Sequence, residues 1–318
     1  MNARAPDSAA IVARALTRRF GDFVAVDGID LSIPRGEVVG FIGPNGAGKS
    51  TTMRMLCGLL QPTSGEARVA GFDVRTQAQD VRAHIGYMSQ KFSLYGDLSV
   101  RENLRFFAGI YRVPRAERAA RVDDALSMAA LEGRADSLVA TLASGWKQRL
   151  ALGCAILHRP PVLFLDEPTS GVEPTARRRF WDLIHALAAD GVTILVSTHY
   201  MEEAEYCNRI ALIDRGRVVA SGGPAELRNR GLGGDLVEIA CAPLGAALER
   251  LGGMPGVLDA AVFGDRVHVL LDAAGPGLER LGESLREAGL QAGEARRVRP
   301  SLEDVFVRQV GGHARSAP

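Results

Sequence analysis

A glycine-rich segment in the first fifth of the chain has the spacing of a phosphate-binding loop. It matches the pattern G-x-x-x-x-G-K-[ST], in which glycines let successive backbone N–H groups face phosphate oxygens. With the residue that follows it, the segment reads Gly43, Pro44, Asn45, Gly46, Ala47, Gly48, Lys49, Ser50 and Thr51. The Lys49 ammonium suits the outer phosphates, and the Ser50 hydroxyl suits Mg²⁺. A chance glycine-rich turn is the alternative.

Two adjacent carboxylates follow a second apolar run. Residues 162–165 are apolar, and Asp166 and Glu167 come directly after them. Ligands of open α/β sheets bind at the carboxyl ends of strands, so this position would bring both acids beside the loop. Asp166 would hold Mg²⁺, directly or through water, and Glu167 would polarise the attacking water as general base. Without the loop, an ordinary acidic strand end is the simpler interpretation.

Apolar runs that alternate with helical patterns must position these residues. The runs at residues 38–42, 162–165 and 193–196 are bounded by turn residues, as in strands buried on both faces of a sheet. A helical stretch at residues 99–138 interrupts the series, and Ser99 with Glu102 forms a capping box at its start. We therefore expect an α/β protein with a largely parallel sheet.

Glycine-rich segments divide the C-terminal part of the chain from the rest. The expected organisation is a tail at residues 1–10, a main domain at 11–225, a linker at 226–234, a small α+β domain at 235–311 and a tail at 312–318. In the small domain, strands are expected at residues 236–239 and 266–270, and helices at 244–251 and 278–288.

Composition argues against several classes of protein. Of the 318 residues, 47% are hydrophobic and 24% charged, and the formal net charge is +1. This is the balance of a soluble globular chain, without the basic excess of a nucleic-acid binder, so no nucleic acid is expected as a partner. No apolar run approaches the roughly 18–20 residues of a membrane helix. The four cysteines form no Cys-x-x-Cys pair, so a zinc site is not expected.

Further motifs make the chain resemble the ATP-binding-cassette (ABC) ATPases over residues 11–225. Gln90 resembles the Q-loop glutamine of that family, and His199 resembles its switch histidine. Residues 142–150 resemble the signature L-S-G-G-x-x-Q-R, and residues 170–174 resemble the D-loop. The resemblance implies a P-loop NTPase core with antiparallel β and helical subdomains, and it implies ATP and Mg²⁺ as cofactors.

The same resemblance implies a two-site ATPase in which each nucleotide is bound between two subunits. Gln90 would reach Mg²⁺ and the attacking water, and His199 would contact the γ-phosphate. Ser144 and Gly145 would act on the nucleotide of the opposite subunit. Phe20 would stack on adenine, with a core phenylalanine as the alternative. One chain carries one loop and one signature, so a homodimer or a heterodimer is required.

Two positions depart from the family pattern. Ala143 stands where the signature has serine, with Ser144 where a glycine is usual, and Glu173 stands where the D-loop has aspartate. A hydrogen bond to a charged acceptor is worth about 1.5–3 kcal/mol, so its loss at Ala143 would weaken the ATP-closed dimer. Ser144 could substitute in part. Glu173 keeps the charge and adds a methylene.

Within the family, the chain resembles the ATP-binding subunits of ABC-2-type exporters, including the daunorubicin-resistance-like group. Residues 20–27, 95–104 and 300–306 carry this resemblance. It implies a separate ABC-2-type integral membrane permease and a peripheral position at the cytoplasmic face of the inner membrane. The permease is expected to dock near residues 91–107, where Phe92, Leu94, Tyr95, Phe106 and Phe107 would supply apolar contact. At least half of these are expected to fill a core instead.

Two other functions remain open. A non-transport ABC ATPase of the DNA-repair or translation-factor kind usually has coiled-coil insertions, zinc cysteines or two cassettes, and the sequence shows none of these. The other is a regulatory NTPase module whose C-terminal domain senses a ligand. The run Arg177, Arg178 and Arg179 could bind phosphate, but we expect a solvated helical face.

Overall fold

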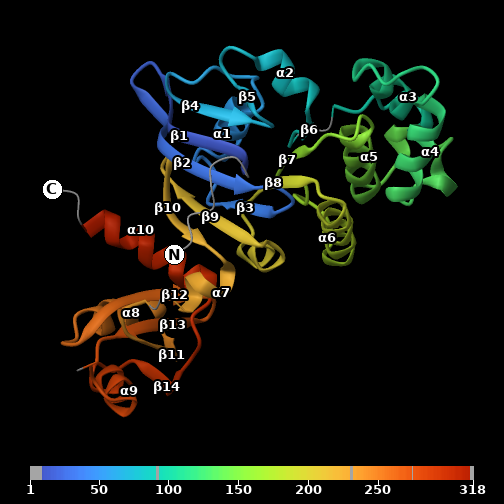
Figure 1. Ribbon diagram of the computed structural model, residues 1–318. Coiled ribbons are helices and arrows are strands. Elements are labelled where there is room, and N and C mark those ends of the chain that lie inside the picture. The colour runs from blue at the N-terminus through green and yellow to red at the C-terminus, as the bar shows by residue number, and fades with distance from the viewer. Residues whose placement is uncertain (1–8, 91–92, 230–231, 274, 316–318) are drawn as a thin grey trace. The chain divides into compact units, whose positions relative to one another are not determined.

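The chain forms two compact units, each with its own hydrophobic core. The computed structural model describes residues 9–90, 93–229, 232–273 and 275–315 (Figure 1). The units are Met1–Ser221 and Gly222–Pro318. All of the residues expected to do chemistry belong to the first unit.

Two sheets build the first unit. One is antiparallel with the strand order β2-β1-β4-β5, and the other has the order β10-β9-β3-β8-β7-β6. The strands are β1 (Ala9–Phe20), β2 (Phe23–Pro34), β3 (Val38–Ile42), β4 (Ser64–Val69), β5 (Phe72–Asp73), β6 (Ile85–Met88), β7 (Val162–Asp166), β8 (Thr193–Thr198), β9 (Arg209–Asp214) and β10 (Arg217–Gly222). From β9 to β6, neighbouring strands of the second sheet are parallel, so their carboxyl ends lie along one edge.

The central strands are buried on both faces, which explains their continuous apolar sequences. Every residue of β3, β7 and β8 is buried. Pairing sets the register: Ile42 is opposite Thr198, and Asp166 is opposite Ser197. The ends of these three strands are therefore adjacent, and the loop after β3 lies beside the acidic end of β7.

Three of the helices of the first unit form a cluster with its own core. The helices of this unit are α1 (Lys49–Leu56), α2 (Ala78–Ala83), α3 (Val100–Ile110), α4 (Arg118–Met128), α5 (Ser144–Ile156) and α6 (Pro174–Ala189), with 3-10 turns η2 (Glu132–Arg134), η3 (Val139–Thr141) and η4 (Met201–Tyr206). Leu104, Leu126 and Leu150, from α3, α4 and α5, share one buried core. The predicted capping box is present: Ser99 Oγ accepts from the Glu102 N–H at 3.2 Å, and the Ser99 N–H donates to Glu102 Oε2 at 2.8 Å.

The second unit is a four-stranded sheet with helices. Its elements are α7 (Pro224–Asn229), β11 (Asp235–Ala242), α8 (Leu244–Gly252), β12 (Val257–Phe263), β13 (Arg266–Leu271), α9 (Leu278–Glu287), β14 (Gln291–Arg297) and α10 (Leu302–Arg315). The strand order is β12-β13-β11-β14, and every pair is antiparallel. Leu251 of α8 and Leu281 and Leu285 of α9 pack into its core.

Three boundaries differ from the sequence-based expectation. The strand β1 begins at Ala9, inside the expected tail at residues 1–10, because Ala9 pairs with Pro34 of β2. The helix α7 occupies the start of the expected linker at 226–234. The helix α10 continues through the expected tail at 312–318 as far as Arg315. Its start is fixed by Ser301 Oγ, which accepts from the Asp304 N–H at 3.1 Å.

Candidate active site

The phosphate-binding loop joins the end of β3 to the start of α1. Residues 43–48 form the loop, and Lys49, Ser50 and Thr51 form the first turn of the helix. Gly48 has φ of 103°, and a Cβ there would lie 2.5 Å from the Ala25 carbonyl oxygen, so only glycine fits. Among the described residues, the N–H groups of Gly48, Lys49 and Ser50 have no protein acceptor. Unpaired N–H groups at a helix N-terminus suit an anion such as phosphate.

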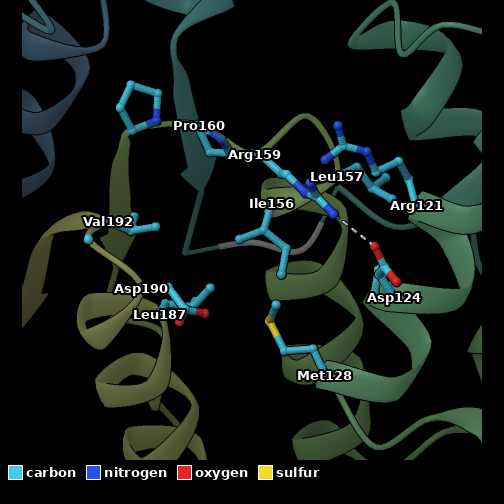
Figure 2. Close-up of a pocket in the computed structure, with 13 residues that line it drawn as sticks. Arg121, Asp124, Met128, Ile156, Leu157, Arg159, Pro160, Leu187, Asp190 and Val192 are labelled. Atoms are coloured by element: carbon cyan, nitrogen blue, oxygen red, sulfur yellow. Dashed lines mark hydrogen bonds and ion pairs between the residues drawn. The ribbon is translucent and has the colours of Figure 1, made fainter. Parts of the chain in front are cut away.

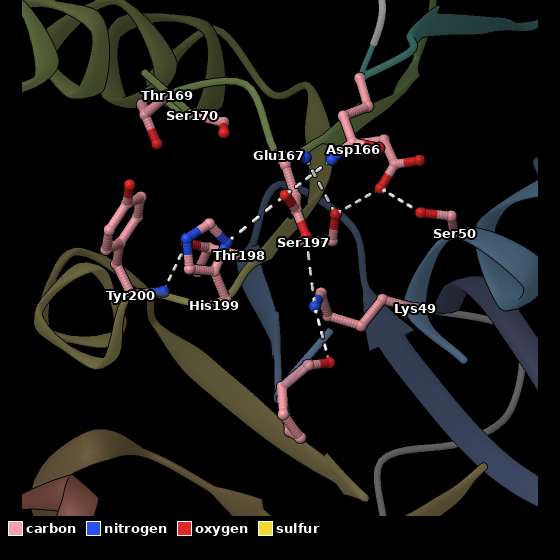
Figure 3. A network of polar contacts seen from close by, with 12 residues as sticks. Lys49, Ser50, Asp166, Glu167, Thr169, Ser170, Ser197, Thr198, His199 and Tyr200 are labelled. Carbon is pink, nitrogen blue, oxygen red and sulfur yellow. Dashed lines mark hydrogen bonds and ion pairs between the residues drawn. The ribbon is translucent and has the colours of Figure 1, made fainter. Parts of the chain in front are cut away.

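The Lys49 ammonium is buried and held by oxygen atoms. Its side chain is 4% exposed, and Nζ donates to the carbonyl oxygens of Gly43 and Pro44 at 2.8 and 3.1 Å. Nζ also lies 3.2 Å from Glu167 Oε1 (Figure 3). A buried charge requires such partners. A phosphate oxygen at the loop would compete with Glu167 for this ammonium.

Three oxygen atoms meet where α1 approaches the ends of β7 and β8. Ser50 Oγ donates to Asp166 Oδ1 at 3.0 Å, and Ser197 Oγ donates to the same oxygen at 2.6 Å (Figure 3). Asp166 is only 1% exposed. Mg²⁺ prefers oxygen ligands and is commonly held by one or two carboxylates together with phosphates. The donors at Ser50 and Asp166 therefore fit Mg²⁺.

The Glu167 carboxylate is the centre of the site. Its Oε2 accepts from Gln90 Nε2 at 3.0 Å and lies 3.4 Å from His199 Nδ1, while Oε1 faces Lys49. Glu167 has φ of 49°, which is rare for a residue other than glycine. Its N–H donates to the carbonyl oxygen and the hydroxyl of Ser197, at 3.1 and 3.0 Å, and these bonds support the unusual conformation. Lys49, Gln90 and His199 thus all contact Glu167.

A second buried network lies beside these residues, and sequence reasoning missed it. Glu203 of η4 has no exposed surface, and its Oε1 accepts from the Thr169 hydroxyl at 2.5 Å. The same oxygen lies 3.5 Å from Arg177 Nε, and the Arg177 guanidinium carbon lies 4.2 Å from the centroid of the Tyr200 ring. The network connects the segment after Glu167 to the segment after β8.

The position of Arg177 corrects one expectation. Its side chain is 18% exposed and pairs with a buried carboxylate, so it is not part of a solvated face. Arg178 and Arg179 are exposed, as expected. The only sequence signal for this network is the position of Glu203 four residues after His199. Because Glu202 beside it is equally acidic, that signal does not single out Glu203.

Among the described residues, the remaining predicted site residues form no hydrogen bond or ion pair with Glu167. Ala143 is the exposed N-cap of α5, and Ser144 and Gly145 begin that helix. Within the described part of the chain, no hydrogen bond or ion pair joins these residues to the loop. Phe20 is 46% exposed at the end of β1, so it is not a core phenylalanine. The Arg18 guanidinium carbon lies 4.5 Å from the centroid of its ring.

This fold is that of an ATP-binding cassette. The family model described as ABC transporter matches residues 26–170. The chain is 38% identical, over 95% of its length and 97% of the relative's, to Nod factor export ATP-binding protein I of Cupriavidus metallidurans. It is 36% identical to daunorubicin resistance ATP-binding protein DrrA3 of Streptomyces coeruleorubidus, over 96% and 97% of the two lengths. The chain therefore belongs to the ABC transporter family.

Two further comparisons define how far the similarity extends. The chain is 50% identical to the probable multidrug ABC transporter ATP-binding protein YbhF of Escherichia coli over 226 residues, which span 70% of this chain but only 39% of that protein. Among solved structures, cbiO1 of Clostridium perfringens, part of the ABC transporter complex cbiONQ, is 31% identical, with a TM-score of 0.65 over 69% of this chain and 90% of that one. The expected ABC ATPase fold is thus confirmed.

Proposed function

We propose that this chain is the ATP-hydrolysing subunit of an ABC-2-type export system, in which ATP-driven closure of a dimer drives efflux through a separate permease. The observation that carries the proposal is the position of Glu167, which contacts Lys49, Gln90 and His199 beside the loop. The names of the relatives, which refer to multidrug, daunorubicin and Nod factor export, support export as the coupled process.

We assign a task to each side chain on the basis of its contacts. Lys49 binds the outer phosphates, and Glu167 accepts a proton from the attacking water. Gln90 and His199 both contact Glu167 Oε2, so they orient the carboxylate. Lys49 contacts the other oxygen, and once phosphate engages Lys49, Glu167 Oε1 is free to face the water.

A metal ion belongs to the proposal because the donors fit it. Ser50 and Asp166 would hold Mg²⁺, and Gln90, which contacts Glu167, would contribute a third ligand. When bound, the ion neutralises charge on the phosphate oxygens.

The proposed working unit contains two cassettes, identical or merely similar. Ser144 and Gly145 at the start of α5 would contact the nucleotide of the opposite subunit. Glu173 is the exposed N-cap of α6 and would lie at the same junction. Phe20 has the exposure that stacking on adenine requires. The second unit would be an accessory domain.

The permease would dock on the helical cluster. Among the described residues, no helix combines the length and the apolarity needed to cross a bilayer. Tyr95 and Phe106 are 45% and 40% exposed, and their ring centroids lie 4.7 Å apart. Leu94 and Phe107 pack against the core of the cluster instead.

The exposed pair Tyr95 and Phe106 is therefore the proposed docking surface. It would hold the chain at the cytoplasmic face of the inner membrane. Lys91 and Phe92, which fall within the expected docking segment, lie outside the described residues.

Glu167→Gln and Lys49→Ala test the catalytic assignment. Glu167→Gln should retain ATP binding while turnover falls by about two to four orders of magnitude, the usual contribution of a general base. Lys49→Ala should lose ATP binding, because the charge for the phosphates is gone. The matched control is the exposed Glu249→Gln, which should match wild type. Wild-type turnover in Glu167→Gln would contradict the assignment.

Co-purification tests the transport assignment. A polytopic membrane protein should co-purify with the wild-type chain, and Tyr95→Ser with Phe106→Ser should lose it while keeping ATP binding. Stimulation of turnover by nucleic acid, with no membrane partner captured, would favour the non-transport ABC ATPases instead.

A further inference from the structure

A cavity of about 570 Å³ lies in the first unit, between the helices α4, α5 and α6 (Figure 2). Its walls come from α4, from the end of α5 and from the end of α6. Pro161 and Val192 also line it, and they directly precede β7 and β8. The cavity is therefore at the amino ends of the two strands whose carboxyl ends form the candidate active site. Its volume is in the range of small-molecule sites, about 300–1,000 Å³.

The floor of the cavity is apolar and comes from three helices. Met128 lies on α4, Ile156 and Leu157 lie at the end of α5, and Leu187 lies on α6 (Figure 2). Leu157 and Leu187 are 2% and 5% exposed, so they are fixed by packing rather than free to close the space. Such a floor suits a hydrocarbon chain or a ring system.

The arginines of the wall already have partners. Arg159 Nη2 lies 3.1 Å from Asp124 Oδ2, the pair drawn in Figure 2. Arg121 Nη2 lies 2.8 Å from Glu117 Oε2. Arg121 Nη1 has no acceptor, but protein atoms cover it, so a molecule in the cavity does not reach it. The positive charges on this side are therefore compensated.

The uncompensated charge of the cavity is negative and lies at the end of α6. Asp190 is the C-cap of α6, and its carboxylate is exposed, with no hydrogen bond or ion pair to any described residue. The helix has no basic residue in its last turn, so the negative end of its dipole adds to the carboxylate. A cation is the ligand group that this end of the cavity favours.

We propose that the cavity is a binding site for a cationic amphiphile, a molecule with a protonated amine and an apolar chain or ring system. The amine pairs with Asp190, and the apolar part lies over Met128, Ile156 and Leu187. A molecule bound there contacts both α5 and α6. These helices begin at Ser144 and Pro174, next to the proposed contacts with the opposite subunit. The proposal does not depend on the proposed function, because binding is measured without nucleotide.

Three ligands with the same ten-carbon chain test the proposal on the full-length protein. Decylammonium, decanol and decanoate are titrated by calorimetry below their micelle concentrations. Decylammonium should bind roughly tenfold or more tightly than decanoate, the effect of one charge-assisted contact. Equal affinity for the cation and the anion would overturn the proposal.

Two variants and one control locate the binding. Asp190→Asn should abolish the preference for the cation and leave the affinity for decanol unchanged. Met128→Trp should weaken the binding of all three ligands, because the indole fills the cavity. Asp182→Asn, an exposed residue on the same helix, should bind like wild type. A preference for the cation that survives Asp190→Asn, or wild-type affinity in Met128→Trp, would show that the amphiphile binds elsewhere.

Discussion

The Thr169 hydroxyl donates a hydrogen bond to the fully buried Glu203 at 2.5 Å, and this bond joins the turn after Glu167 to η4. Thr169 follows Glu167 by two residues, and Glu203 follows His199 by four. The bond therefore links the segments that carry Glu167, the proposed general base, and His199, in addition to the direct contact between those two side chains. Arg177 compensates the buried carboxylate from α6.

Thr169→Val should therefore destabilise the protein and slow ATP turnover. Valine has nearly the same shape but no hydroxyl, so Glu203 loses a donor in a buried position, at a cost of about 1–3 kcal/mol. Urea unfolding measures the stability, and steady-state hydrolysis measures the turnover. The control is the exposed Thr175→Val, with an expected change within about 0.5 kcal/mol. Equal midpoints for the two variants would show that the bond contributes nothing.

Ser197→Ala should impair hydrolysis more than nucleotide binding. The hydroxyl donates to Asp166 Oδ1 at 2.6 Å and accepts from the Glu167 N–H at 3.0 Å. Its loss therefore frees the Asp166 carboxylate and the backbone of Glu167. The positive φ of Glu167 then lacks one of its two supports. We expect kcat to fall while the Kd for ATP changes less, measured against Ser127→Ala, an exposed residue on α4. A kcat equal to that of the control would refute this role.

Ala143→Ser should stabilise both the monomer and the ATP-bound dimer. Ala143 is the N-cap of α5 in an extended conformation, with ψ of 156°, and it provides no side-chain bond to the helix. Serine accepts such a bond, which is worth about 0.5–2 kcal/mol. In the proposed dimer it also supplies the hydroxyl that the family signature has at this position.

Ala143→Asn separates these two effects. It caps the helix without restoring the signature serine. It should therefore raise the unfolding midpoint of the monomer and leave the stability of the ATP-bound dimer unchanged. Gel filtration with ATP in the Glu167→Gln background measures the dimer. An unchanged or weaker dimer in Ala143→Ser would count against the assignment of the signature.

The features that sequence reasoning predicted are those set by local pattern. Residues 38–42 are a strand because all their side chains apart from Gly40 are apolar and both faces of the sheet are covered. The capping box at Ser99 depends on residues three apart. Glu203 and Arg177 could not be predicted in this way. Their burial depends on Thr169 and on each other, which the fold brings together from three separate segments.

The same reason explains the misplaced boundaries. Residues 9–10 carry no strand signal of their own, and pairing with β2 makes Ala9 part of β1. The helix α10 starts from reciprocal bonds between Ser301 and Asp304 and continues past Gly311 and Gly312, the two glycines between which the expected tail begins. The cavity beside Asp190 is likewise formed by segments far apart in sequence.

Acid should destabilise this protein partly through His158. Burial lowers the pKa of His158 from its ordinary value of 6.5, and His84 lowers it further, although the bond of Nε2 to the Ile85 carbonyl opposes both effects. The unfolded chain therefore binds the proton at a higher pH than the folded one. The contribution of His158 to stability is complete above pH 6.5 and is lost as the pH falls from there to the lower folded-state pKa.

His158→Gln keeps a donor for the Ile85 carbonyl but cannot titrate. Urea midpoints at about pH 7.5 and about pH 5.5 should therefore differ more in wild type than in His158→Gln. Equal differences would show that His158 does not contribute to the acid sensitivity.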